Sequence, residues 1–310
     1  MRIFVTGGTG FVGRAVVALL LRHGHDVEVL VREHSLLRMP YRRRLRIVEG
    51  DLLEPGAWQG RARSADAVVH LANAELKQWI SRAPAHALQQ GTVNLIEAIM
   101  HSSRVPPRVV CLSHLGSDMG AESPVLRLAA EKEEMIRRSG SDYLLLRSAP
   151  IFGPGDRFVT AWARWLRVVP ALPVMASAAD VKLQPIALRN VVEGIAKAVK
   201  KRTLPRREYD LAGPRLYTLA DLLQAVGSTV RRTKVRRWPI APAWYRRWAN
   251  MLAGSPCFAV PAHVWEAWAE VQPCNPVAFY RDFCIRPIQI TADLPAGAPE
   301  RSHQAAEQTT

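Results

Sequence analysis

Three glycines near the start of the chain stand at the spacing that a bound phosphate requires. Gly8, Gly10 and Gly13 form a G-x-G-x-x-G pattern after a short apolar run and before a helical one. Glycine allows a tight turn and close approach to a pyrophosphate, and the first N–H groups of the following helix face the anion. The predicted phosphate loop of a dinucleotide comprises Gly7, Gly8, Thr9, Gly10, Phe11, Val12 and Gly13.

The residue that ends the second predicted strand distinguishes the two nicotinamide dinucleotides. An acidic residue there would bind the ribose hydroxyls of NAD, whereas this strand ends at Val31 and is followed by Arg32. A guanidinium pairs well with a 2′-phosphate, so NADP(H) is favoured over NAD(H). Glu33 comes next, and a shift of one residue would reverse this preference. Asp51, after the third strand, is predicted to contact the adenine edge.

The elements that must position these residues alternate along the chain. Apolar runs predict strands at 2–5, 27–31, 46–48, 67–71, 108–112 and 143–146, and helical spacing predicts helices near 11–20, 92–100 and 122–138. Continuous apolar strands between helices favour an α/β fold, a doubly wound parallel Rossmann sheet with a small C-terminal lobe. Further on, strands are expected at 183–188 and 208–211 and a helix at 219–226.

The organisation follows from these elements. We expect residues 1–155 to form the NAD(P)-binding Rossmann core and residues 156–290 to form a C-terminal lobe interleaved with the last core strands. Residues 291–310 lack an apolar face and are expected to be a disordered tail.

Several longer motifs resemble one superfamily. They are T-G-G-T-G-F-V-G from Thr6, V-E-G-D-L from Val48, V-V-H-L-A from Val68, G-T-V-N-L-I-E-A from Gly91, and the stretch from Leu144 to Asp156. Together they resemble the extended and atypical short-chain dehydrogenase/reductases of the NAD-dependent epimerase/dehydratase type. Within that superfamily the chain is most similar to the branch that contains the NAD(P)-binding accessory subunit of respiratory complex I. The resemblance covers roughly residues 1–230.

The resemblance implies further residues of the cofactor site. Pro150, Ile151 and Phe152 match the segment that runs beside the nicotinamide, and Ser113 matches a serine at the end of the fifth strand. The remaining predicted cofactor contacts are Leu52, Leu71, Ala72 and Asn94.

The resemblance also implies a catalytic Tyr-x-x-x-Lys pair, and the match fails there. Val125 stands where the tyrosine is expected and Ala129 where the lysine is expected. Neither side chain can transfer a proton. Between residues 116 and 141 there is no tyrosine, and Lys132 is the only lysine. The classical reaction of the family is therefore in doubt, with Ser113 left as a candidate catalytic residue.

Three other residues are candidates for a substitute acid. His114 is interpreted first as a loop histidine in water, Tyr143 as a residue that packs or caps at the start of the sixth strand, and Asp156 as a cap of the following helix. No residue pattern predicts a metal site: none of the four cysteines has C-x-x-C spacing, which also favours a reducing, cytoplasmic compartment.

A strongly basic segment stands out in the C-terminal part. The net charge is +15, and from Arg231 to Trp248 arginines alternate with tryptophan and tyrosine. This composition suits an anionic membrane surface or a protein partner such as a respiratory complex, whereas nucleic acid is unlikely because nothing else supports it. The competing interpretation is a small lobe with tryptophans in its core and arginines in water. A peripheral position on the inner face of a membrane follows from the first of these.

Two functional hypotheses result. The first is an NAD(P)(H)-binding protein without the Tyr-x-x-x-Lys pair that has a structural, assembly or redox-sensing role near respiratory membrane components. The alternative is an NADP-dependent oxidoreductase or nucleotide-sugar-epimerase-like enzyme with a non-standard acid. The sequence leaves open whether the protein is an enzyme.

Overall fold

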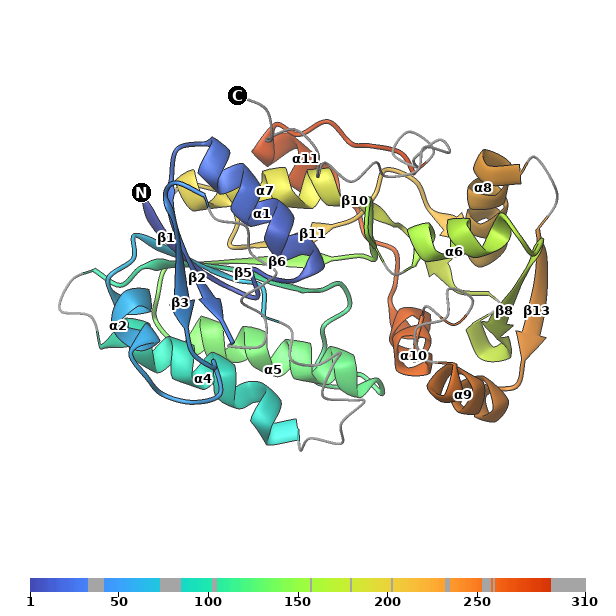
Figure 1. Cartoon of the computed structure of the whole chain (residues 1–310), viewed down its shortest axis with the longest axis horizontal. Coiled ribbons are helices and arrows are strands. Elements are labelled where there is room, and N and C mark those ends of the chain that lie inside the picture. The colour runs from blue at the N-terminus through green and yellow to red at the C-terminus, as the bar shows by residue number, and fades with distance from the viewer. Residues whose placement is uncertain are drawn as a thin grey trace, which may run out of the picture.

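A parallel sheet forms the centre of the molecule (Figure 1). The computed structural model describes residues 1–32, 42–72, 85–101, 105–156, 158–178, 180–201, 203–231, 235–252, 258 and 260–290. In this part of the chain the sheet has seven strands in the order β11-β6-β5-β4-β1-β2-β3. In chain order they are β1 (Arg2–Thr6), β2 (Asp26–Val31), β3 (Leu45–Glu49), β4 (Ala67–His70), β5 (Arg108–His114), β6 (Tyr143–Ser148) and β11 (Glu208–Leu211).

Helices cover both faces of this sheet because its strands are apolar on both sides. Val5 and Val29 belong to the core under α1 (Phe11–Arg22), α7 (Leu188–Lys200) and α11 (Val277–Phe283). Phe4 and Leu30 face the opposite core, which is covered by α2 (Trp58–Arg63), α4 (Ala85–Met100) and α5 (Pro124–Arg138). The strand order and the two layers confirm the predicted doubly wound Rossmann sheet.

The C-terminal lobe lies at one end of the long axis of the molecule (Figure 1). Its aromatic core includes Trp162 and Trp265, whose rings stack with centroids 5.9 Å apart. The elements of the lobe are α6 (Val159–Leu166), β8 (Ala171–Met175), the 3₁₀ turn η2 (Ala176–Ala178), β9 (Lys182–Leu183), β12 (Tyr217–Thr218), α8 (Leu219–Arg231), β13 (Arg236–Ile240), α9 (Pro242–Met251) and α10 (Ala262–Glu270). Between them the chain returns to the Rossmann core for α7 and β11.

One predicted strand is wrong. The run expected as a single strand at 183–188 contains β9, then β10 (Ile186–Ala187), and α7 begins at Leu188. Pro185 lacks an N–H group and interrupts the run, so the pairing changes from β12 on one side to β7 (Ile151–Phe152) on the other.

Other predicted boundaries move by a few residues. The fifth strand continues through Ser113 to His114, the helix expected from residue 122 begins at Pro124, and the one expected to end at 226 reaches Arg231. The C-terminal residues 291–310 and Glu33 lie outside the described residues.

A buried ion cluster joins α5 to the outer strands of the sheet. The carboxylate of Glu133 is 1% exposed and accepts hydrogen bonds from Arg147 at 2.6 Å and from Arg137 at 2.9 Å. Both guanidinium groups also reach Glu208 of β11. Burial by itself raises the pKa of Glu133, but hydrogen bonds from Arg147 and Ser113 outweigh it, so the pKa is held below its ordinary value.

This cluster predicts a pH-dependent contribution to stability. Glu133→Gln should lower the free energy of unfolding at pH 7 by about 3 kcal/mol, because it leaves the guanidinium groups without their buried carboxylate. The contribution exists while the carboxylate is ionised in both states, and it is lost as pH falls below the ordinary value of 4.5 and through the lower folded-state pKa. The gap between the two proteins should therefore shrink in acid. Urea denaturation at several pH values measures it.

Glu134→Gln is the matched control for this measurement. Glu134 is the next residue of the same helix, and its ion pairs with Arg137 and Arg138 lie at the surface. Surface pairs contribute little. An equal loss of stability in both variants would contradict the role assigned to Glu133.

Candidate functional site

The glycine loop connects β1 to α1 at the carboxyl edge of the sheet, and two of its positions exclude any side chain. Gly7 has φ +72°, and a Cβ there would lie 2.6 Å from the carbonyl carbon of Leu71 and from the amide nitrogen of Ala72. A Cβ on Gly13 would lie 2.1 Å from the carbonyl oxygen of Gly7. The loop is therefore packed closely against the start of α1 and against the end of β4, which only glycine permits.

The amino end of α1 is arranged to receive an anion. Gly10 caps the helix, and the first intrahelical bond runs from Arg14 N to Gly10 O at 3.1 Å. The N–H groups of the first three residues of α1 therefore have no acceptor within the helix. The first turn holds no acidic residue, and the guanidinium of Arg14 donates to Thr9 O at 2.9 Å. Helix dipole, N–H groups and a nearby cation all favour a phosphate here.

A buried histidine of the V-V-H-L-A motif packs next to this loop, a structural role that the motif itself did not indicate. His70 ends β4, and its Nδ1 lies 2.7 Å from Oγ1 of Thr6, the residue before Gly7. Its Nε2 lies 3.3 Å from Oγ1 of Thr92 on α4. His70 thus fixes the two loops that follow β1 and β4 relative to one another. The one signal in the sequence is a polar residue inside the otherwise apolar run at 67–71.

The residues predicted to contact the adenosine half surround the ends of β2 and β3. Arg32 is exposed directly after β2. Asp51 Oδ1 accepts the N–H of Leu53 at 3.0 Å, which shapes the turn after β3. Asn94 is buried on α4 and donates to the carbonyl oxygen of Leu52 at 3.0 Å. Asp51 and Asn94 therefore hold the loop backbone in place, whereas the Arg32 side chain extends into solvent at the edge of the site.

The residues predicted for the nicotinamide half are divided between backbone and side-chain roles. Pro150 and Ile151 are half-buried, and Pro150 O accepts the N–H of Ile186 at 2.9 Å. Phe152 is fully buried in the core of the lobe, so its side chain anchors the lobe.

Leu71 and Ala72, after β4, are half-buried. Ser113 is buried, with Oγ 3.3 Å from Ser117 Oγ and a hydrogen bond to Glu133.

The positions expected to carry the proton-transferring pair are apolar and buried on α5. Val125 is 4% exposed and Ala129 is 0% exposed. Val125 packs with Leu126 against Ala267 of α10. The lobe therefore covers this end of α5. The two positions themselves carry no titratable side chain.

One lysine does lie on the same side of α5. Lys132 is 4% exposed, and its Nζ donates to Leu112 O at 3.4 Å, next to Ser113 in β5. Residues 125, 129 and 132 share one helix face, and helical side chains lean toward the helix amino end. The ammonium group therefore reaches β5 from the helix face that also carries positions 125 and 129.

The substitute acids considered from the sequence have structural contacts. Asp156 caps α6, because its Oδ1 accepts the N–H groups of Phe158 and Thr160 at 2.7 and 2.9 Å, as predicted. Tyr143 begins β6 and packs on the core, with Arg207 over its ring. Tyr209 of β11 was not among these candidates; burial is the first cause that raises its pKa to about 12, and its hydroxyl donates to Asp282.

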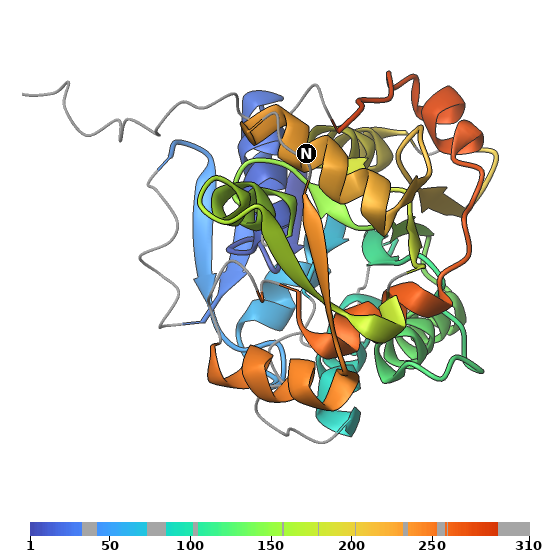
Figure 2. The same ribbon diagram turned by 90° about the vertical axis from the view of Figure 1, so that its right-hand side faces the viewer.

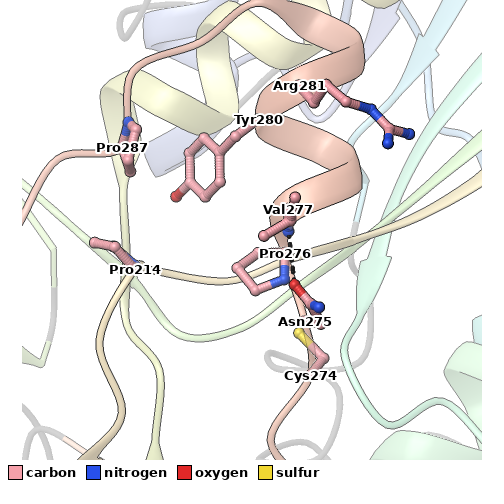
Figure 3. A pocket seen from close by; sticks show the side chains of 8 residues that line it. All are labelled: Pro214, Cys274, Asn275, Pro276, Val277, Tyr280, Arg281 and Pro287. Carbon is pink, nitrogen blue, oxygen red and sulfur yellow. Dashed lines mark hydrogen bonds between the residues drawn. The ribbon is translucent and has the colours of Figure 1, made fainter.

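Two surface hollows adjoin the linker between α10 and α11. One, of about 510 Å³, lies beside α11, with Tyr280 between Pro214 and Pro287 (Figure 3). Its polar groups are engaged locally, since Tyr280 donates to Ala212 O and Asn275 accepts the N–H of Val277. Burial raises the pKa of the Cys274 thiol to about 11, which keeps it protonated near neutral pH. This hollow carries no reactive group.

The second hollow, of about 590 Å³, lies between the loop after β5 and the same linker. Its charged lining residues are Arg147, Asp210, Asp118 and Glu270. Burial and the neighbouring carboxylates of Glu133 and Glu208 raise the pKa of Asp210, against the opposing effect of Arg147. Among the described residues, no three His, Cys, Asp or Glu side chains gather in a way that would hold a metal ion.

Known proteins are similar to this chain over much of its length. The NAD dependent epimerase/dehydratase family matches residues 3–120. The mitochondrial NADH dehydrogenase [ubiquinone] 1 alpha subcomplex subunit 9 of Rattus norvegicus is 27% identical over 257 residues, which are 81% of this chain and 66% of that protein. The chain thus spans slightly less than two thirds of this relative's length.

Two further similarities involve reductases. The ceramide reductase of Caulobacter vibrioides is 29% identical over 202 residues, covering 64% of this chain and 59% of that protein. The crystal structure of the triphenylmethane reductase of a Citrobacter species, complexed with NADP(H), superposes with a TM-score of 0.75 at 15% identity, covering 94% of this chain and 98% of that chain. This last similarity concerns the fold.

The close contact at Gly13 gives a test of the loop. Gly13→Ala places a methyl group against the Gly7 carbonyl, so it should destabilise the protein by about 1–3 kcal/mol. It should also weaken dinucleotide binding at least about tenfold, because the start of α1 must move away from the loop. Thermal unfolding and fluorescence titration with NADPH measure the two effects.

Gly60→Ala is the control for this variant. Gly60 lies exposed in α2, and a Cβ added there would have no atom within 4 Å. Alanine at this position should leave binding unchanged and keep or slightly raise stability. Normal NADPH affinity in Gly13→Ala would show that the loop does not hold the phosphates.

Proposed function

Because the chain belongs to the extended short-chain dehydrogenase/reductases of the NAD-dependent epimerase/dehydratase type, we propose that it binds NADP(H) and acts as a binding protein, without the family's Tyr-x-x-x-Lys chemistry. The observation that carries this proposal is the combination of a fitted phosphate loop with apolar residues at both catalytic positions. Gly7 and Gly13 allow the loop to pack closely against the end of β4 and the start of α1, whereas Val125 and Ala129 are buried and Val125 packs against α10.

The preference for NADP(H) over NAD(H) rests on Arg32. This residue follows the last residue of β2, where the 2′ position of the adenosine ribose lies in a Rossmann site. Its side chain is exposed, so it can turn toward a 2′-phosphate without breaking a core contact. A guanidinium–phosphate pair is charge-assisted and adds affinity that the 2′-hydroxyl of NAD(H) does not provide.

The cellular role that fits these properties is structural, assembly-related or redox-sensing, near respiratory membrane components. Its support is the similarity over 81% of the chain to a subunit of mitochondrial NADH dehydrogenase. A protein that holds NADP(H) but does not consume it can couple its own folding stability to the dinucleotide concentration, since ligand binding stabilises only the folded state.

A second candidate is an NADP-dependent oxidoreductase or epimerase-like enzyme with a different acid. Two observations favour it: the 29% identity to ceramide reductase, and the position of Lys132 next to Ser113 near the end of β5. In this case the nicotinamide would supply or accept the hydride, and these two side chains would orient the substrate oxygen.

Cofactor selectivity is tested by Arg32→Ala. The variant should bind NADPH about 10- to 100-fold more weakly, the value of one charge-assisted hydrogen-bonded pair, and should bind NADH as the parent protein does. Arg22→Ala is the control. Arg22 lies at the end of α1 that is remote from the phosphate loop, so this variant should change neither affinity. Isothermal titration with both dinucleotides measures the effect. Parallel losses for NADPH and NADH would contradict the assignment of Arg32 to the 2′-phosphate.

Turnover separates the two candidate functions. The purified protein, saturated with NADPH, is incubated with a panel of quinones and carbonyl compounds while absorbance of the reduced nicotinamide is followed. We expect no oxidation above the rate without protein, because no acid stands at positions 125 and 129. Oxidation that falls in Ser113→Ala or Lys132→Met, with the NADPH affinity of each variant unchanged, would establish the enzyme instead.

A further inference from the structure

The outer side of the lobe carries an apolar surface bordered by arginines. β13 and α9 follow one another in the chain, separated only by Ala241, and lie at the end of the molecule that Figure 2 faces. Trp238 on β13 is 60% exposed and Trp244 on α9 is 56% exposed. Both rings lie 6.4 Å from the ring of Trp248, so the three indoles are contiguous.

The helix extends this surface. Trp244, Trp248 and Met251 are spaced i, i+4 and i+7 and therefore share one side of α9. Met251 is 70% exposed, and Leu252 after the helix is also exposed. Trp248 is half-buried against Phe258 and fixes the stripe to the lobe core. We call the surface formed by Trp238, Trp244, Trp248, Met251 and Leu252 the tryptophan face.

The charge around the tryptophan face has a single sign. Residues 235–252 contain Arg236, Arg237, Arg246 and Arg247 and no aspartate or glutamate. All four arginines are exposed. Arg246 pairs with Glu266 of α10, on the side of α9 away from the indole stripe. Arg236, Arg237 and Arg247 thus bring positive charge to the edge of an exposed apolar surface.

We propose that the tryptophan face binds the surface of an anionic lipid bilayer. Indole rings suit the depth of the headgroups, where an apolar body meets a polar edge, and arginines at that depth attract anionic headgroups. An amphipathic helix with cations beside an apolar stripe lies in this interface without crossing it. None of the described helices is long and apolar enough to span a bilayer.

Two features of the face disfavour a second copy of the chain as its occupant. In the described part of the chain β13 pairs only with β8, so its other edge is open to pairing with a strand of a second copy. Such pairing is disfavoured because Pro239 has no N–H to donate and the arginines of β13 carry like charges. Two such faces would also bring like charges together. The tryptophan face itself offers no carboxylate to the cations of a second copy, whereas a bilayer requires only negative charge and apolar depth.

This inference names the membrane partner of the proposed function, but it rests on residues of the lobe and not on the nucleotide site. It is tested by sedimentation of the full chain with vesicles of phosphatidylcholine alone or with added phosphatidylserine. We expect binding to the anionic vesicles at about 0.1 M salt, much weaker binding at about 1 M salt, where the screening length falls to about 3 Å, and none to neutral vesicles.

Two variants locate the binding surface. Replacing three arginines of the face should weaken binding to anionic vesicles about 100-fold, from about fivefold for each cation near the surface; the variant is Arg236→Gln/Arg237→Gln/Arg247→Gln. Trp238→Ser/Trp244→Ser keeps every charge and should also weaken binding, because it removes the apolar anchors. The charge-matched control is Arg22→Gln/Arg42→Gln/Arg43→Gln, three exposed arginines of the Rossmann core.

Each outcome either supports the proposal or overturns it. Loss of binding in the two face variants but not in the core control supports it. Equal losses in both arginine variants would mean that polyanions attract the whole basic protein, which overturns the proposal. Equal binding to neutral and anionic vesicles, or no vesicle binding at all, would mean that the tryptophan face has a different occupant, which also overturns it. Thermal unfolding of every variant shows that it is folded, and NADPH titration keeps the two proposals separate, because the nucleotide site can fail while the vesicle result holds, and the reverse.

Discussion

The close approach of Gly13 to the Gly7 carbonyl is the constraint on which the nucleotide site depends. A Cβ on Gly13 would lie 2.1 Å from the Gly7 carbonyl oxygen, so the start of α1 can pack onto the end of β1 only if residue 13 carries no side chain. The first N–H groups of α1, which have no acceptor within the helix, therefore lie directly beside the loop. His70 then ties Thr6 to Thr92 and so holds the neighbouring loop after β4 at a fixed distance. A phosphate site of this kind needs few side chains because its donors belong to the backbone.

The lobe limits what the site can do chemically. α10 packs Ala267 onto Val125, and the buried Glu133 cluster fixes the same helix to β6 and β11. α5 is therefore held by contacts at both ends. Positions 125 and 129 of this fixed helix carry no titratable side chain. A larger side chain at 125 would have to displace α10, so the apolar residue and the closed lobe are physically consistent with one another.

Local features were predictable from the sequence, and long-range ones were not. The glycine loop, the alternation of strands and helices, and the cap by Asp156 depend on neighbours within a few residues. The contact between His70 and Thr6 joins residues 64 positions apart, and Glu133 meets partners from two elements. The strand expected at 183–188 failed because its second half pairs with β7 and not with β12. The sequence also did not reveal which aromatic residues are buried: within the basic segment from Arg231 to Trp248, Tyr245 is buried whereas Trp238 and Trp244 are exposed.

The two anion-directed surfaces of the molecule work by different physics. The loop uses fixed backbone dipoles in a half-buried turn, which salt screens weakly, whereas the arginines of the lobe act through solvent and lose strength beyond a Debye length of about 10 Å. α10 contacts α5 through Ala267 on Val125 and α9 through Glu266 on Arg246. One helix of the lobe thus packs against the helix that carries positions 125 and 129 and pairs with the helix that carries the indoles, so the two surfaces share a structural element although they attract anions in different ways.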